Sequence, residues 1–250
     1  MLAMRAQHGG RPFLAVVSVV SIALALSLTV LDAPLVHAAG APDAASGLSS
    51  AVGAADEKAP KKADLFDEIY QRSLPMAASL KTIRARFTET TTSSLLAAPL
   101  VAEGTLVAVR PVDLLITYTK PDRKILRMDA RKLLFIWPDR HLRQESDIEQ
   151  AQKRVQHYFV DKSPDDLRRH FTIHATEDTQ KPGTYLVDLV ATRKQIKEGV
   201  SKIELWLDKQ SLMLSAMRMT FPNGDTKTMA LHDVEVNAPV DRETLDRETR

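Results

Sequence analysis

Hydrophobic residues follow a helical period near residue 64 and change to a strand period beyond residue 82. Apolar side chains recur at helical spacing at Leu65, Phe66, Ile69 and Leu74. Asp64 is a suitable N-cap for this helix, and Pro75 is placed to open a second short helix over residues 75–81. We therefore expect two short helices at the start of the folded part.

From residue 83 the apolar positions alternate with polar ones. Ile83, Ala85 and Phe87 would share one face of a strand that continues into a Thr-rich stretch. Further runs of strand length follow at close spacing, over residues 104–110, 114–119, 124–129, 132–138 and 141–148. Pro, Asp or Lys-Arg clusters of hairpin length separate them, which predicts an antiparallel meander.

Two predicted helices and then five more predicted strands follow. Residues 148–159 have helical spacing, and residues 163–171 predict a second helix with Ser163 as N-cap and Pro164 in its first turn. Strand patterns resume over residues 171–178, 184–191, 201–208, 212–221 and 226–236, and Asn223-Gly224 is a hairpin signal between the last two. Since no helix-length crossover separates paired strands, we expect a mainly β fold with an antiparallel sheet and two groups of added helices.

Several of these strands are apolar at consecutive positions, namely TLVAV, LLI, KLLFIW and LVDLV. A one-sided antiparallel sheet alternates apolar with polar residues, so both faces of these strands need cover. The few short helices leave room for an apolar cavity that would suit a hydrophobic ligand. Met213, Met217, Met219 and Phe221 would lie on one face of their strand, as cavity lining or as ordinary core.

The N-terminus has the pattern of an export signal. Two arginines precede an uncharged apolar run from Phe13 to Leu31, and Val36 and Ala38 then supply the small residues of a signal-peptidase site. We expect residues 1–38 to be a cleaved signal peptide and the remainder to lie in the periplasm. The alternative is an uncleaved anchor in the inner membrane, because the run could nearly span a bilayer.

Residues 39–63 differ in composition from the residues after them. They are rich in Ala, Gly, Ser and Pro and have almost no large apolar residue, so they cannot bury enough surface to fold. We interpret them as a flexible linker, which leaves residues 64–250 as the folded domain.

Composition excludes several classes of protein. Lys and Arg number 34 against 32 Asp and Glu, without the concentrated basic stripe of a nucleic-acid binder. The chain of 250 residues has no cysteine, which excludes disulfides, thiol catalysis, cysteine metal sites and a lipid-modified N-terminal cysteine. Any membrane attachment must come from elsewhere.

No catalytic or metal-binding motif emerges from the sequence. His170 and His174 lie near Glu177, but the chain passes from a predicted helix to a predicted strand at Phe171, so the histidines share no helical face. Neither a Gly-x-Ser-x-Gly elbow nor a phosphate-binding Gly-rich loop is present. We therefore expect a binding protein without catalytic residues, metal or cofactor.

Four stretches, taken in order, resemble one family. They are SLKTIRARFTET (79–90), GTLVAVRPVDLLITYTKPDRK (104–124), FIWPD (135–139) and IELWLDKQSLMLSAMRMTFPNGDTKTMALHDVEVN (203–237). Over about residues 65–245 the chain resembles the periplasmic outer-membrane lipoprotein carrier proteins, the LolA family. The resemblance implies an incomplete antiparallel β-barrel with a lid of short helices over an apolar cavity that holds lipoprotein acyl chains.

The resemblance also implies site residues. Arg110, followed by Pro111, matches the family's Arg-Pro motif, whose arginine bonds to backbone carbonyls of the lid in the closed carrier; the alternative is a solvated strand end. Apolar positions that match the cavity lining in character are Leu106, Leu114, Ile116, Phe135, Met217 and Met219.

The function implied is a monomeric periplasmic carrier that shuttles lipoproteins from the inner to the outer membrane. Its partners would be acylated lipoproteins, an inner-membrane ABC-type release complex and an outer-membrane acceptor. The long linker, the basic stretch PDRKILRMDARK and the insertion KSPDDLRRHF depart from the family pattern and leave the cargo open. The alternative is a LolA-like sensor, or a carrier for another envelope lipid.

Overall fold

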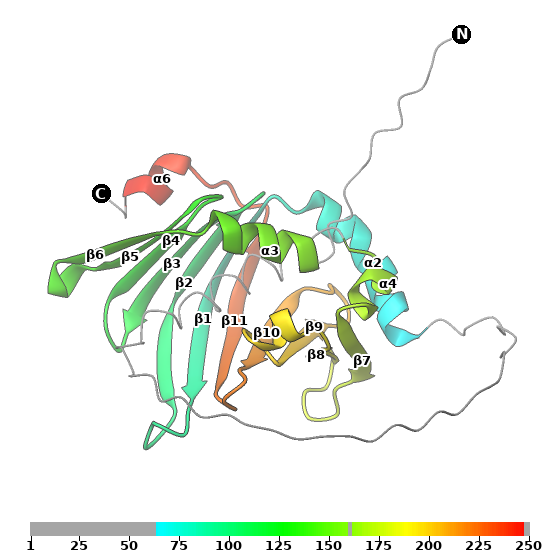
Figure 1. Cartoon of the computed structure of the whole chain (residues 1–250). Helices are drawn as coiled ribbons and strands as arrows, with labels where there is room; N and C mark the ends of the chain where they lie inside the picture. The colour runs from blue at the N-terminus through cyan, green and yellow to red at the C-terminus, as the bar shows by residue number, and fades with distance from the viewer. Residues whose placement is uncertain (1–63, 160–161, 248–250) are drawn as a thin grey trace, which may run out of the picture.

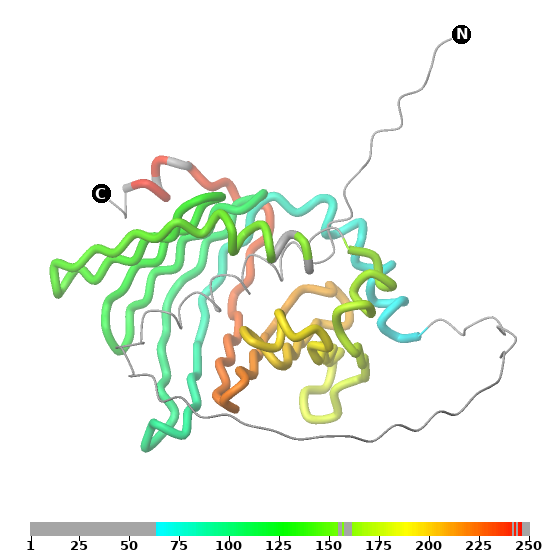
Figure 2. Tube along the Cα trace, in the orientation of Figure 1, coloured from blue at the N-terminus to red at the C-terminus, as the bar shows by residue number. Residues whose placement is uncertain are grey.

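Residues 64–159 and 162–247 are described by the computed structural model, and an antiparallel sheet of eleven strands forms its centre. The strand order is β6-β5-β4-β3-β2-β1-β11-β10-β9-β8-β7. The sheet curves strongly without closing, so that β6 and β7 remain as separate edges (Figures 1 and 2). This confirms the mainly β, incomplete-barrel architecture; the predicted signal peptide (1–38) and linker (39–63) lie outside the described residues.

The strands are β1 (Thr82–Thr92), β2 (Leu100–Val109), β3 (Asp113–Lys120), β4 (Lys124–Met128), β5 (Lys132–Trp137), β6 (Leu142–Asp147), β7 (Phe171–Glu177), β8 (Thr184–Ala191), β9 (Lys202–Asp208), β10 (Leu214–Thr220) and β11 (Thr226–Val236). The helices are α2 (Leu65–Ser79), the short 3₁₀ turn η1 (Pro138–Arg140), α3 (Glu149–Phe159), α4 (Pro164–Arg168), α5 (Lys194–Lys197) and α6 (Arg242–Arg247). Neither α5 nor α6 was predicted from the sequence.

One continuous helix replaces the two that we expected before β1. Pro75 lies inside α2 and does not begin a new helix. A proline inside a helix costs about 3 kcal/mol because it removes a backbone hydrogen bond. Here the buried face continues past it, since Ser73 and Ala77 on either side of the proline are both buried. Packing of that face against the sheet outweighs the cost.

The face of the sheet that carries Ile83, Ala85 and Phe87 of β1 is called the inner face below. These three residues are buried while Arg84 and Arg86 between them are exposed, which confirms the predicted alternation. The inner face belongs to one large hydrophobic cluster, to which the helical segments contribute Phe66, Ile69 and Tyr70 from α2, Leu167 from α4 and Ile196 from α5. The helices therefore help to bury one side of the sheet.

The opposite, outer face of β2–β5 has a cover that sequence analysis missed. Leu115 and Ile125 of the outer face form a second hydrophobic cluster with Leu245 of α6, and Val240 packs against it. Figure 1 shows α6 beside the upper ends of these strands, away from α2 and α4. The runs TLVAV, LLI and KLLFIW are thus explained on their outer side by the C-terminal segment. The run LVDLV on β8 is not covered there, and it alternates, since Val187 and Leu189 are buried while Leu186 is partly buried and Val190 is exposed.

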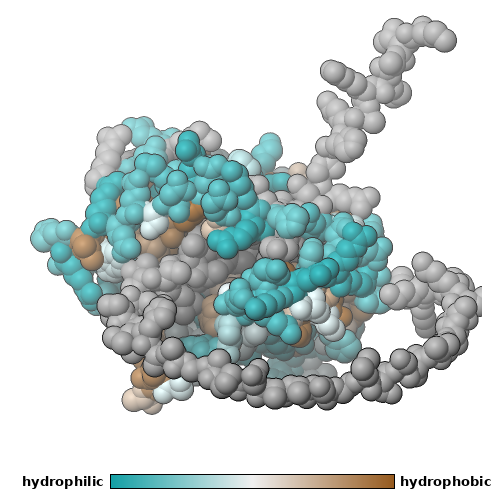
Figure 3. All heavy atoms as spheres, viewed as in Figure 1, coloured by the Kyte–Doolittle hydropathy of each residue, from teal (hydrophilic) through white to brown (hydrophobic). Residues whose placement is uncertain are grey.

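The view in Figure 3 shows a surface that is mostly hydrophilic, with a hydrophobic patch at the end of the hairpin between β1 and β2. Its exposed apolar residues are Leu95, Leu96, Leu100 and Val101. The hairpin end therefore lies outside both hydrophobic clusters.

Gly104 of β2 is the point where the inner face packs most tightly. A Cβ atom at this position would lie 2.2 Å from the Thr117 carbonyl oxygen and 2.9 Å from the Phe87 ring. The missing side chain lets Phe87 and Tyr118, on the strands either side, pack edge to face with their ring centroids 5.1 Å apart. The glycine is thus required for close approach.

We predict that Gly104→Ala lowers the free energy of unfolding by about 1–3 kcal/mol, because the added methyl group must displace a backbone carbonyl and a buried ring. Gly199→Ala is the control, since the nearest atom to its new Cβ is the Ile196 carbonyl oxygen at 3.7 Å. Urea unfolding of both variants checks the prediction. Equal stability of the two variants would contradict it.

Candidate ligand-binding face

The inner face of β2–β5 is a continuous apolar surface. In its first row, residues lie directly opposite one another in the order Leu106, Ile116, Leu126 and Phe135. In its second row the order is Ala108, Leu114, Met128 and Leu133. Residues directly opposite in antiparallel strands share a face, so these eight side chains form one surface.

The same face continues over β9–β11. Met217 lies opposite both Leu205 of β9 and Met229 of β11, and Met219 lies opposite Ile203. A register shift between Leu214 and Ala216 changes which residues point inward at the start of β10.

The register shift corrects one expectation. Leu214 lies opposite Leu207, which is two residues from Leu205, so Leu214 takes the inward position. Met213 precedes the strand and is only partly buried, and it does not continue the row of Met217 and Met219.

All six apolar residues proposed from the sequence lie on the inner face and in the same hydrophobic cluster. None is more than 2% exposed. The four on β2, β3 and β5 are separated from the two on β10 by the central strands β1 and β11. The structure thus brings them together as one curved surface.

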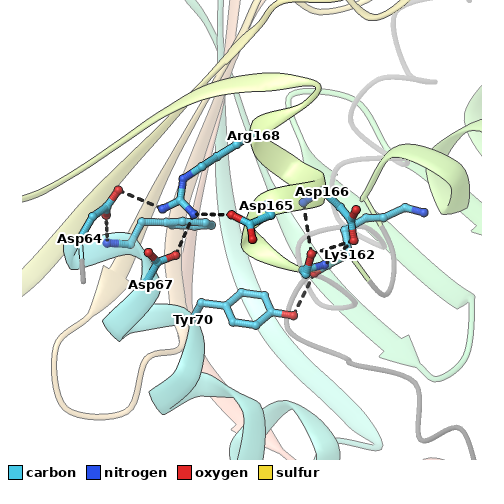
Figure 4. Close-up of polar contacts among 9 residues, drawn as sticks. Asp64, Asp67, Tyr70, Lys162, Asp165, Asp166 and Arg168 are labelled. Carbon is cyan, nitrogen blue, oxygen red and sulfur yellow. Dashed lines mark hydrogen bonds and ion pairs between the residues drawn. The ribbon is translucent and has the colours of Figure 1, made fainter. Parts of the chain in front are cut away.

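Helices α2 and α4 are joined by a single arginine (Figure 4). The Arg168 guanidinium of α4 lies 2.9 Å from a carboxylate oxygen of Asp64 and 2.9 Å from one of Asp67, at the start of α2. Its plane also approaches the Phe66 ring, with 5.6 Å between Cζ and the ring centroid. One planar cation with several donors thereby fixes both helices relative to each other.

Three further hydrogen bonds, from Tyr70 and Arg72 of α2, hold this helix pair in place. The Tyr70 hydroxyl donates to the Lys162 carbonyl oxygen at 2.9 Å, just before α4 (Figure 4). Arg72 of α2 donates to the Tyr185 hydroxyl at 3.2 Å and to the Lys209 carbonyl oxygen at 3.1 Å. The N-terminal half of α2 is therefore fastened to α4 and to the β8 side of the sheet.

Arg110 lies at the other end of α2. It follows β2 directly, and its Nη1 donates to the Ala77 carbonyl oxygen at 2.8 Å and to the Leu80 carbonyl oxygen at 3.4 Å. Ala77 is in the last turn of α2 and Leu80 is its C-cap. Carbonyls at a helix C-terminus lack partners within the helix and carry partial negative charge, so a guanidinium is a favourable partner for them.

Four polar side chains lie together on the otherwise apolar inner face. The Tyr118 hydroxyl donates to Glu89 Oε2 at 3.0 Å, and Lys227 Nζ lies 3.3 Å from Glu89 Oε1. Lys124 Nζ lies 4.0 Å from the centroid of the Tyr118 ring. Glu89 and Lys227 are buried, with side-chain exposures of 6% and 7%. We call Glu89, Tyr118, Lys124 and Lys227 the polar row.

Burial is the largest influence on the pKa values of Tyr118 and Lys124. The pKa of Tyr118 is raised well above its usual value, first by burial and then by the charge and hydrogen bond of Glu89. The pKa of Lys124 is lowered, chiefly by burial, with the Glu89 charge opposing the change and the Lys227 charge adding to it. Both pKa shifts have the direction expected when burial leaves the charged form of the side chain poorly solvated.

Sequence analysis missed the polar row, although one signal for it was present. Glu89 continues the alternation of Ile83, Ala85 and Phe87, so the strand period itself places a carboxylate on the apolar face. A buried carboxylate needs a partner, which would have directed attention to lysines on the adjoining strands.

The two histidines considered in the sequence analysis, His170 and His174, lie immediately before β7 and within it. His170 precedes β7, and His174 within β7 lies opposite Asp188 of β8. Over residues 64–159 and 162–247, no group of three or more His, Asp or Glu side chains is arranged to hold a metal ion. None of the helices in these ranges is both long and apolar enough to cross a membrane.

Solved structures with a similar fold include a putative outer membrane lipoprotein-sorting protein domain from Vibrio parahaemolyticus, 12% identical, covering 73% of this chain and 97% of that one, with a TM-score of 0.41. The lipoprotein LppX of Mycobacterium tuberculosis is 13% identical over 71% of this chain and 97% of its own, with a TM-score of 0.44. An uncharacterized conserved protein from Thermus thermophilus is 9% identical over 74% and 94%, with a TM-score of 0.47.

No curated protein matches the chain, and the structural likenesses are too distant to bear on function. The sequence profile described as "Outer membrane lipoprotein carrier protein LolA" matches residues 78–246, which is more than half of the chain. This chain therefore belongs to the LolA family.

Proposed function

We propose that this protein is a periplasmic carrier that holds lipoprotein acyl chains against its inner face and shuttles them from the inner to the outer membrane. The observation that carries the proposal is the continuous apolar surface of the inner face, which runs from Phe135 on β5 to Met217 and Met219 on β10. Acyl chains are bound by contact with apolar surface, which requires no catalytic group.

The proposed working cycle involves two partners besides the cargo. An inner-membrane ABC-type complex would release the acylated lipoprotein to the carrier, and an outer-membrane acceptor would receive it. The carrier acts as a monomer without a cofactor, and it reaches the periplasm by means of the signal peptide expected over residues 1–38. Membership in the LolA family supports this assignment.

A second candidate function is a sensor of, or carrier for, another envelope lipid. The polar row favours it, because acyl chains alone offer no anionic partner to Lys124, whose ammonium group lies over the Tyr118 ring. A lipid with both a long apolar body and a polar head would match both parts of the inner face.

We predict that the full-length chain binds a dansyl-labelled undecanoic acid and that Met217→Gln weakens this binding about tenfold or more. The substitution nearly keeps the side-chain volume but places an amide on the apolar face, which costs about 1–3 kcal/mol without a partner. Fluorescence titration measures the affinity, and thermal melting measures folding in parallel.

Arg218→Gln is the matched control for this experiment. Arg218 is the next residue along β10, lies opposite Glu204 and Thr228 on the outer face, and is partly exposed. Ile116→Thr repeats the test on β3 in case Met217→Gln fails to fold. If Arg218→Gln weakens the probe as much as either inner-face variant, or if no probe binds, the inner face is not the binding surface.

A carrier must also release its cargo, and we propose that Arg110 serves this step. Interactions that exist only when the lid is closed oppose the retention of cargo, because they favour the empty state. The bonds from Arg110 to the carbonyls of Ala77 and Leu80 join the end of α2 to the corner between β2 and β3. If α2 moves when cargo enters, these bonds break on loading and re-form on release.

We predict that Arg110→Leu still folds and still accepts acylated cargo, but transfers it about tenfold more slowly to an acceptor membrane. A hydrogen bond to a charged group contributes about 1.5–3 kcal/mol, and each 1.4 kcal/mol changes a population about tenfold. Arg110→Lys should restore transfer only in part, because one ammonium cannot match the planar fork of a guanidinium.

A transfer assay with preloaded carrier measures this effect. Arg84→Leu is the control, since Arg84 is an exposed arginine on the outer face of the neighbouring strand β1. Release from Arg110→Leu at or above the wild-type rate would identify Arg110 as an ordinary helix-capping residue.

A further inference from the structure

The polar row crosses five adjacent strands of the sheet. Lys124 of β4 lies opposite Tyr118 of β3, and Tyr118 reaches past Gly104 of β2 to Glu89 of β1. On the other side of Glu89, Lys227 extends from β11. The row therefore places one carboxylate between two ammonium groups on a face that is otherwise apolar.

The carboxylate of the polar row pairs with only one of the two lysines. Glu89 already accepts a hydrogen bond from Tyr118 and pairs with Lys227, so its two oxygens both have partners within the row. Lys124 instead lies over the Tyr118 ring, which attracts an ammonium but is a weaker partner than an anionic oxygen.

We propose that the polar row binds the anionic head group of an amphiphile whose apolar body lies along the inner face. This inference rests on the proposed function, because it requires that the inner face holds an apolar ligand. A carboxylate or phosphate oxygen beside Lys124 would give its ammonium group an anionic partner and take up its N–H donors. The cargo class is thus an acidic lipid, which makes the second candidate function more specific.

The environment of Lys124 favours an anionic head group over a cationic one. Its pKa is lowered mainly by burial, and the nearby Lys227 lowers it further. A bound anion would act in the opposite sense and raise this pKa, as Glu89 already does in part. A cationic head group would add a third positive charge to the same poorly solvated row, which is unfavourable.

The test compares dansyl-labelled undecanoic acid with its methyl ester, two probes with the same apolar body and different head charge. On the full-length chain we expect the acid to bind about tenfold or more tightly than the ester, as for a hydrogen bond to a charged group. Lys124→Met should reduce this ratio to near one. Glu89→Gln should increase it, because it removes the competing carboxylate and keeps a hydrogen-bond acceptor for Tyr118.

Lys120→Met is the matched control. Lys120 lies on the same β3–β4 hairpin, but it pairs with Glu103 at 2.9 Å and its side chain is 69% exposed. Its loss should leave the ratio of acid to ester affinity unchanged. Melting curves show whether each variant is folded, and Glu89→Gln provides the answer if Lys124→Met does not fold.

The outcomes separate this inference from the proposed function. If acid and ester bind equally well to the wild type, or if Lys124→Met leaves the ratio unchanged while binding persists, the anion site is wrong and the apolar binding face stands. If neither probe binds, both proposals are wrong.

Displacement of the labelled acid by competitors of equal chain length identifies the head group. Dodecanoate and dodecyl phosphate carry a carboxylate and a phosphate, and dodecanol carries no charge. The inference requires at least one of the two anions to displace the probe about tenfold better than dodecanol. Equal displacement by all three would overturn it.

Discussion

Burial of a curved sheet that is largely apolar on its inner face, and apolar on both faces over β2–β5, is the constraint that organises this molecule. The inner face is part of one cluster with residues from α2, α4 and α5, and the outer face of β2–β5 is closed by Leu245 of α6. The close approach at Gly104 then allows two rings to meet across a strand on the inner side.

Most strands could be predicted from the sequence because their period is local and their hairpins carry clear turn signals. Asn223-Gly224 between β10 and β11 is an example, with Gly224 at φ +85°. The helix α6 could not be predicted, because its only large apolar residue is Leu245 and its partners Leu115 and Ile125 lie far away in the sequence. Its existence depends on tertiary contact and not on propensity.

The candidate site was likewise predictable where a local pattern determines it, and not where it depends on contacts between distant strands. Alternation on β2 and β3 places Leu106, Leu114 and Ile116 on one face, but only the sheet order shows that Met217 on β10 shares that face with them. The register shift beside Ser215 breaks the local period, so the position of Met213 could not be read from spacing. The partners of Glu89 likewise come from β3 and β11, which are remote from it in sequence.

An open sheet differs from a closed barrel in having two unpaired edges, and each edge is a potential site for another strand. At one edge, β6 presents Arg143, Glu145 and Asp147 to solvent, and Glu145 pairs with Lys132 of β5. Charges along an edge oppose strand addition by a second copy of the chain, because pairing would place them close together and remove water from them. The fold can therefore leave its barrel unclosed without becoming prone to polymerise through that edge.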